Sequence, residues 1–114
     1  MAAGIGASLA LASDLIIASE TAYLLMAFKN VGIPPDGGAV FFLTQHLGIA
    51  RAKELVYSAR KLPAREAAEM GIVMKVVPDD ELEASAQGVK TALVCKSLLG
   101  KAHTVMAEGG IAAA

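Results

Sequence analysis

The octapeptide Val31-Gly32-Ile33-Pro34-Pro35-Asp36-Gly37-Gly38 is the most informative stretch of the sequence, and the apolar run Val40-Phe41-Phe42-Leu43 follows it closely. The prolines fix φ and remove two backbone donors, whereas the glycines allow positive φ and the close approach of another group. The stretch therefore predicts a rigid turn that leads into a helix starting near Gly37 or Gly38. Taken alone, it favours an ordinary turn or helix-cap aspartate, because such residues outnumber catalytic ones.

The composition limits the classes of function. The chain has 114 residues, which suits one domain or a piece of a larger one. Hydrophobic residues make up 55% and aromatic residues only 4%, a mixture typical of close-packed helices with apolar surface left for a partner or for further chain. The formal net charge is -1, and because Lys and Arg are scattered, we expect no nucleic-acid partner.

Membrane and metal partners are not expected either. The uncharged residues 1–13 lack a basic leader, and Asp14 ends the run well short of the roughly 20 apolar residues that a membrane span needs. The single cysteine, Cys95, cannot form an internal disulfide, which favours a reducing compartment, the cytoplasm or a reducing organelle matrix. No cluster of metal-ligand residues is visible.

A second glycine-containing stretch, Gly4-Ile5-Gly6, precedes strong helix formers and predicts a tight loop that enters a helix at Ile5 or Gly6. A helix start leaves backbone N–H groups without partners, so it can hold an anion or a developing oxyanion. Simple close packing explains most such glycines equally well, and the full dinucleotide fingerprint is missing.

Periodicity predicts an α/β chain. Expected strands are residues 15–18, 23–26 and 72–77, and expected helices are residues 38–47, 49–59, 63–70 and 82–106.

Five motifs stand in a familiar order. They are residues 4–15 (GIGASLALASDL), 31–38 (VGIPPDGG), 47–55 (LGIARAKEL), 64–73 (AREAAEMGIV) and 76–82 (VVPDDEL). In this order and spacing the chain resembles the second half of the enoyl-CoA hydratase/isomerase (crotonase) superfamily over about residues 4–109. The resemblance implies an α/β crotonase-like fold of repeated ββα turns. Residues 1–114 would form a single, partial, helix-rich C-terminal portion without the N-terminal half and the final helix.

The resemblance also implies a chemistry. Family members act on acyl-CoA thioesters, without a separate cofactor, and usually form trimers or pairs of trimers. They stabilise a thioester enolate with two backbone N–H groups, of which one matches Ile5, where the family usually has glycine; the other comes from the first half of the fold. The substrate pocket implied by the family motifs contains Gly4, Gly6, Ser8, Phe28, Ile33 and Gly37.

The acidic positions favour one reaction over another. The two glutamates of the family's hydratases fall on Ser8 and Phe28, and neither side chain is suited to activate water. Asp36 falls where double-bond isomerases of the family carry one acidic residue and where aryl-CoA dehalogenases carry a nucleophile. We therefore expect an enoyl-CoA isomerase with Asp36 as the catalytic proton shuttle. The alternatives are a hydratase or dehalogenase of the same superfamily, and a truncated, non-catalytic protein that acts by assembly.

The remaining residues of interest are the apolar neighbours of Asp36, two lysines, two histidines and the cysteine. Ile33, Pro34, Val40 and Phe41 would keep water away from the Asp36 carboxyl group. Lys96 and Lys101 could reach the phosphates of CoA, although a solvated helix face explains them as well. His46, His103 and Cys95 are interpreted as surface or packing residues.

Overall fold

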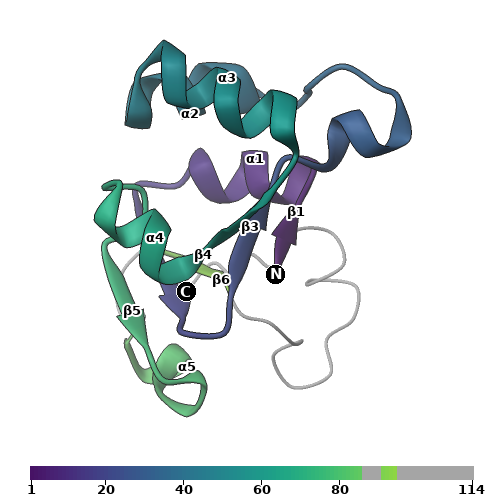
Figure 1. Ribbon diagram of the computed structural model, residues 1–114. Coiled ribbons are helices and arrows are strands. Elements are labelled where there is room, and N and C mark those ends of the chain that lie inside the picture. Colours follow the sequence, from purple (N-terminus) through teal and green to yellow (C-terminus); the bar gives the residue numbers. More distant parts are fainter. Residues whose placement is uncertain (86–90, 95–114) are drawn as a thin grey trace.

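The computed structural model describes residues 1–85 and, as a backbone strand, residues 91–94. Its strands form two three-stranded sheets (Figure 1). The first sheet has the order β1 (Ala2–Ala3), β3 (Tyr23–Leu25), β4 (Lys61–Pro63), and the second has the order β5 (Lys75–Val77), β2 (Leu15–Ser19), β6 (Thr91–Val94). All pairs are parallel except β3 with β4.

Helices lie between and above the strands. They are α1 (Ile5–Leu11), α2 (Ala39–Leu47), α3 (Ile49–Ser58), α4 (Ala64–Glu69) and α5 (Leu82–Ser85), with 3₁₀ turns η1 (Ala27–Val31) and η2 (Asp79–Glu81). In Figure 1, α2 and α3 run side by side above α1. Gly48 alone separates α2 from α3, and its φ of 78° reverses the chain between them.

Small side chains let these layers approach closely. Ala7 and Ala10 on the inner face of α1 are fully buried and form one apolar core with Leu11 of α1, Leu43 of α2 and Leu55 of α3. Because alanine adds little thickness, α1 can lie directly beneath α2 and against the first sheet. The alanine-rich composition therefore allows α1, α2 and α3 to pack closely against one another.

Most predicted elements are confirmed within a few residues. The strands at 15–18 and 23–26 and the helices at 38–47, 49–59 and 63–70 are all present. The strand predicted at 72–77 begins only at Lys75, although Ile72 and Val73 are buried. The short strands β1 and β4 were not predicted.

The predicted long helix over residues 82–106 is wrong. Helix α5 ends at Ser85, and Thr91–Val94 form strand β6, which pairs in parallel with Leu15–Ala18 of β2. Strand β2 is the central strand of its sheet, so it needs partners on both edges, and this tertiary demand overrides the helical periodicity. Residues 95–106 lie outside the described part of the chain.

Candidate active site

The first part of the site is the start of α1. Gly4 donates its N–H to the carbonyl of Leu25 at 2.9 Å and then turns the chain with φ 55° and ψ −126°, a conformation suited to glycine. Its carbonyl accepts the N–H groups of Ala7 and Ser8. Within the described residues, the amides of Ile5 and Gly6 have no acceptor. These two N–H groups are therefore free to bind an oxygen, as expected at a helix start.

The second part is the Asp36 turn, which the structure brings against α1. The buried hydroxyl of Ser8 donates to the backbone carbonyl of Asp36 at 2.8 Å. Gly37 has φ +61°, and a Cβ atom there would collide with Cδ1 of Ile5 and lie 3.0 Å from Cβ of Ser8. Two regions separated by 28 residues are thus joined by one hydrogen bond and one tight contact.

The Asp36 carboxyl group is open to solvent. Its Oδ1 accepts the N–H of Gly37 at 2.7 Å, and the residue is exposed. The expected apolar shield is wrong for the described part of the chain. Ile33, Val40 and Phe41 are themselves 52%, 47% and 61% exposed, and Pro34 is exposed as well.

Ser8 and Phe28, which the family resemblance aligns with the hydratase acids, have structural roles here. The Ser8 hydroxyl is buried, and its proton is directed to the Asp36 carbonyl, with the Gly4 carbonyl at 3.3 Å. Phe28 is 4% exposed and belongs to the core. Neither can exchange a proton with a ligand.

The other predicted site residues divide into three groups. Gly6 is buried, Gly4 and Gly37 are half-buried, and Ile33 is exposed beside a groove. Exposed His46 lies with Nε2 3.2 Å from the carbonyl of Leu11, the last residue of α1, in agreement with a packing role. Four other candidates lie outside the described residues: Cys95, Lys96, Lys101 and His103.

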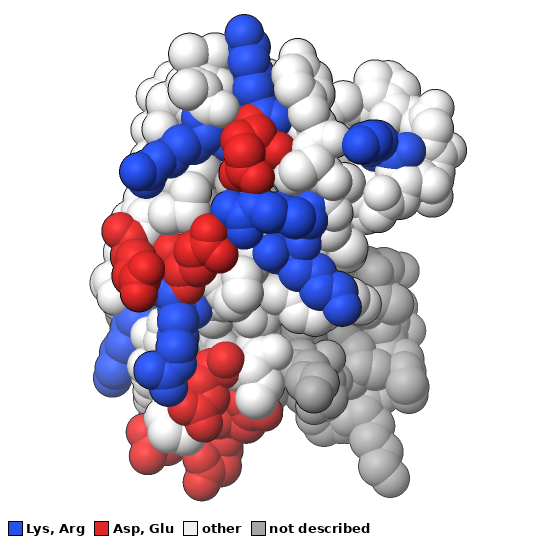
Figure 2. Space-filling model, in the orientation of Figure 1, with Lys and Arg blue, Asp and Glu red and all other residues white. Residues whose placement is uncertain are grey.

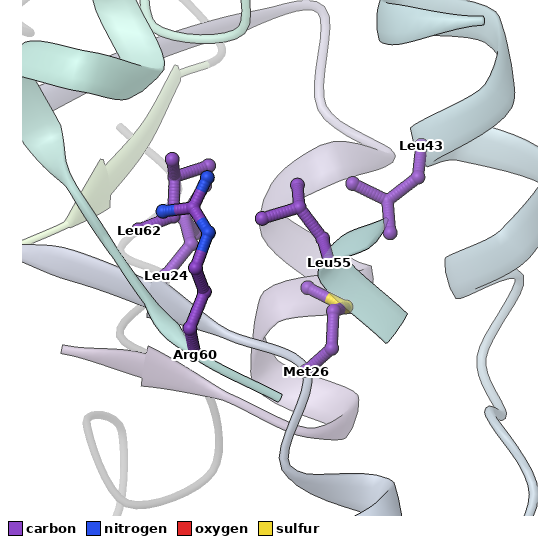
Figure 3. Close-up of a pocket in the computed structure, with 6 residues that line it drawn as sticks. All are labelled: Leu24, Met26, Leu43, Leu55, Arg60 and Leu62. Carbon is purple, nitrogen blue, oxygen red and sulfur yellow. The ribbon is translucent and has the colours of Figure 1, made fainter. Parts of the chain in front are cut away.

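An apolar groove that the sequence did not reveal runs beside the Asp36 turn. It consists of a cavity of about 250 Å³ and one of about 540 Å³, both of which are lined by Pro35, Val56 and Tyr57. Exposed Tyr57 was an available signal, since aromatic residues make up only 4% of the chain. The cavity in Figure 3 is different, because its volume is about 10 Å³ and its lining is mostly aliphatic. It is a small gap in the core between α2, α3 and the first sheet.

Charged groups form local pairs away from the Asp36 turn. Arg60 binds Glu54 at 2.7 Å and Glu66 at 2.8 Å, which links the end of α3 to α4. The hydrogen bond from Arg60 lowers the pKa of Glu54. On the face drawn in Figure 2, basic and acidic groups are interleaved, and acidic groups gather at the lower end near α5.

Two kinds of site are absent from the described residues. No helix among them is long and apolar enough to span a bilayer. They also contain no group of three or more His, Cys, Asp or Glu residues placed to hold a metal ion.

Comparison with known proteins gives consistent matches. The family model for enoyl-CoA hydratase/isomerase matches residues 1–108. The chain is 44% identical over 82 residues to a Rhodobacter capsulatus protein named as an enoyl-CoA hydratase, covering 72% of this chain and 32% of the relative. It is 43% identical over 91 residues to the trans-2-decenoyl-[acyl-carrier-protein] isomerase of Streptococcus mutans, covering 80% and 35%.

A solved structure from Thermobifida fusca, assigned to the enoyl-CoA hydratases and in complex with CoA, superposes with a TM-score of 0.72 at 40% identity. The match covers 75% of this chain and 33% of that one. These matches confirm the crotonase-like α/β class that the motifs predicted. The chain belongs to the enoyl-CoA hydratase/isomerase family, and it spans about a third of the length of the relatives it matches.

Proposed function

We propose that this chain carries the acid–base residue of an enoyl thioester isomerase, and that this residue is Asp36. The observation that supports the proposal best is the hydrogen bond from Ser8 to the Asp36 carbonyl, together with the contact between Gly37 and Ile5. Both interactions hold the Asp36 turn at the free amides of α1. A carboxylate and an oxyanion donor are thereby kept on neighbouring segments.

The proposed reaction moves one double bond. The Asp36 carboxylate removes a proton from the carbon beside the thioester carbonyl, and the electron pair of the broken C–H bond forms an enolate. The N–H of Ile5 stabilises the enolate oxygen, with a second donor supplied by the rest of the family fold. Asp36 then returns the proton to the γ-carbon, so that a β,γ-unsaturated thioester becomes α,β-unsaturated.

Isomerisation is preferred to hydration because only one acidic residue is available at the family's positions. Hydration needs one group that activates water and another that protonates the carbon, whereas Ser8 and Phe28 offer neither. A single carboxylate is sufficient to move a proton within one substrate. We take the substrate to be an acyl-CoA, because a structure similar to this chain binds CoA.

The test supplies 3-hexenoyl-CoA and follows the absorbance of the conjugated product. Removing a general base typically lowers the rate by about 10²–10⁴-fold, so Asp36→Asn should lose activity to that extent. Asp14→Asn, which changes another exposed aspartate, should retain the wild-type rate. Equal rates for Asp36→Asn and the wild type would refute the assignment. Appearance of the 3-hydroxy product from 2-hexenoyl-CoA would instead favour the hydratase alternative.

A second candidate is a non-catalytic protein that acts by assembly. It is favoured by the solvent-exposed Asp36 carboxyl group and by the exposed apolar side chains near it, among them Val31 at 70% and Phe41 at 61%. Light scattering combined with calorimetric titration of hexanoyl-CoA separates the candidates. Oligomers without stoichiometric binding would support assembly, and tight binding to each subunit would contradict it.

A further inference from the structure

The side chain of Ile5 occupies the space between the start of α1 and the Asp36 turn. A Cβ atom placed on Gly37 would collide with Cδ1 of Ile5 and would lie 3.4 Å from its Cγ1. The methyl end of Ile5 is therefore found where a side chain at residue 37 would be. Because Oδ1 of Asp36 accepts the N–H of the same Gly37 at 2.7 Å, the carboxylate and the Ile5 side chain meet at one residue.

The start of α1 directs the Ile5 side chain and the Ile5 amide to the same end of the helix. In an α-helix the Cα–Cβ bonds tilt toward the N-terminus, and the free N–H groups of the first turn point the same way. Ile5 is the first residue of α1, and its amide has no acceptor within the described residues. An oxygen atom bound to this amide would therefore have the Ile5 side chain beside it.

The Ile5 side chain combines a stiff branch with a more adaptable end. Isoleucine carries two heavy atoms on Cβ, which restricts χ1 in any backbone conformation. The Cδ1 end contacts Gly37 and keeps some freedom, because the residue is 46% exposed. Ile5 is thus accessible to a ligand, and it presents an apolar surface next to any group bound at its own amide.

The α-carbon of the substrate must fit beside this surface. In the proposed reaction it is two bonds from the thioester oxygen held by the Ile5 amide, and it must also be within reach of the Asp36 carboxylate. A hydrogen atom on this carbon needs little room, whereas a methyl branch needs space that the Ile5 side chain already fills. We propose that Ile5 is a specificity-determining residue that admits thioesters with an unbranched α-carbon and excludes those with an α-methyl branch. The inference rests on the proposed function for the position of the thioester.

The binding test compares two isomeric ligands, butanoyl-CoA and 2-methylpropanoyl-CoA, which differ in the branch at the α-carbon and contain no double bond to move. Calorimetry of the 114-residue chain should give a Kd about tenfold lower for the unbranched isomer. This is the low end of the range for one methyl group in an apolar pocket, because the exposed end of Ile5 can yield in part.

Two substitutions of Ile5 grade the effect. Ile5→Ala keeps the backbone amide and removes both branches of the side chain, so the affinities for the two isomers should become nearly equal. Ile5→Val removes only Cδ1, the atom nearest to the added Cβ on Gly37, and should give an intermediate preference. If Ile5→Ala does not fold, as judged by circular dichroism, Ile5→Val decides, because it keeps the branch at Cβ.

Leu9→Ala is the matched control. Leu9 lies about one turn further along α1 and is 48% exposed, but it is not among the three atoms nearest to the added Cβ on Gly37, which belong to Ile5 and Ser8. The control should keep the wild-type preference. Equal affinities of the wild type for both isomers, absence of binding, an unchanged preference in the Ile5 variants, or the same loss of preference in Leu9→Ala would each overturn the inference.

The Asp36→Asn variant separates this inference from the proposed function. Loss of turnover of 3-hexenoyl-CoA with an unchanged binding preference supports both. Unchanged turnover with the preference intact refutes Asp36 as proton shuttle and leaves the assignment of Ile5 standing. Loss of turnover in Asp36→Asn, together with equal affinities of the wild type for the two isomers, refutes the assignment of Ile5 alone.

Discussion

Gly37→Ala is the perturbation that tests most directly how the Asp36 turn is held. Gly37 has φ +61°, and an added Cβ would meet Cδ1 of Ile5 and would lie 3.0 Å from Cβ of Ser8. Gly32→Ala is the matched control, because Gly32 has φ +74° but no heavy atom within 4 Å of the added Cβ. Both substitutions strain the backbone, and only Gly37→Ala also introduces a steric clash.

The free-energy cost of backbone strain can be separated from the cost of the steric clash. Alanine at positive φ costs roughly 1–2 kcal/mol, so Gly32→Ala should lower the free energy of unfolding by that amount. At Gly37 the clash adds to this cost. The end of the Ile5 side chain can move, since the residue is 46% exposed, but Cβ of Ser8 is fixed in α1 and should add about 1 kcal/mol. Weakening the hydrogen bond from Ser8 to Asp36 adds about 1 kcal/mol more.

Urea denaturation followed by circular dichroism measures the difference. With a slope near 2 kcal/mol/M, typical of small proteins, the midpoint of Gly37→Ala should fall about 1 M below that of Gly32→Ala. Isomerase activity should decrease in Gly37→Ala and remain in Gly32→Ala, because only the former displaces the carboxylate from α1. Equal midpoints for the two variants would refute the tight contact between the turn and the helix.

Two further predictions concern the scaffold. Leu43→Ala, at a position 1% exposed, should lower the free energy of unfolding by about 2–5 kcal/mol, whereas Phe41→Ala on the same helix, 61% exposed, should change it by less than about 0.5 kcal/mol in urea denaturation. Glu54→Gln should cost at most about 1 kcal/mol at pH 7, because both partners of the Glu54–Arg60 pair are partly exposed. Arg60 lowers the pKa of Glu54 from its usual value of 4.5, so this contribution is present above that value and disappears as the pH falls through the lowered pKa. The difference between variant and wild type in unfolding free energy should therefore be smaller at pH 3 than at pH 7, and an equal difference at both pH values would contradict this assignment.

Local sequence patterns were sufficient to predict a helix where one physical cause determined it. The glycine at position 48 and the apolar spacing around it defined two consecutive helices, and both are present as α2 and α3. Pro63 was expected at the first position of the next helix. It instead ends β4 and caps α4, so the boundary differs by one residue. The motif order identified the family, which the comparison confirmed.

Long-range pairing could not be predicted in the same way. Thr91–Val94 fit the apolar spacing of a helix, but their backbone pairs with β2, about 76 residues earlier in the chain. The apolar groove beside the Asp36 turn had the same origin. It forms where α3 passes the turn, and apart from Tyr57 neither segment signals that meeting. The shielding of Asp36 was predicted from neighbours in sequence, but these side chains are themselves exposed to solvent in the described part of the chain.

The identity of residue 8 and the position of Asp36 are physically linked. The backbone carbonyl of Asp36 accepts the hydroxyl of the fully buried Ser8 at 2.8 Å. A carboxylate at position 8 has no proton to donate, so it would set two acceptors against each other and leave a buried charge unpaired. An acid at residue 8 and this placement of the Asp36 turn are therefore poorly compatible. Under the proposed function, serine at the position that the resemblance assigns to a hydratase acid also makes the hydrogen bond that holds the Asp36 turn against α1.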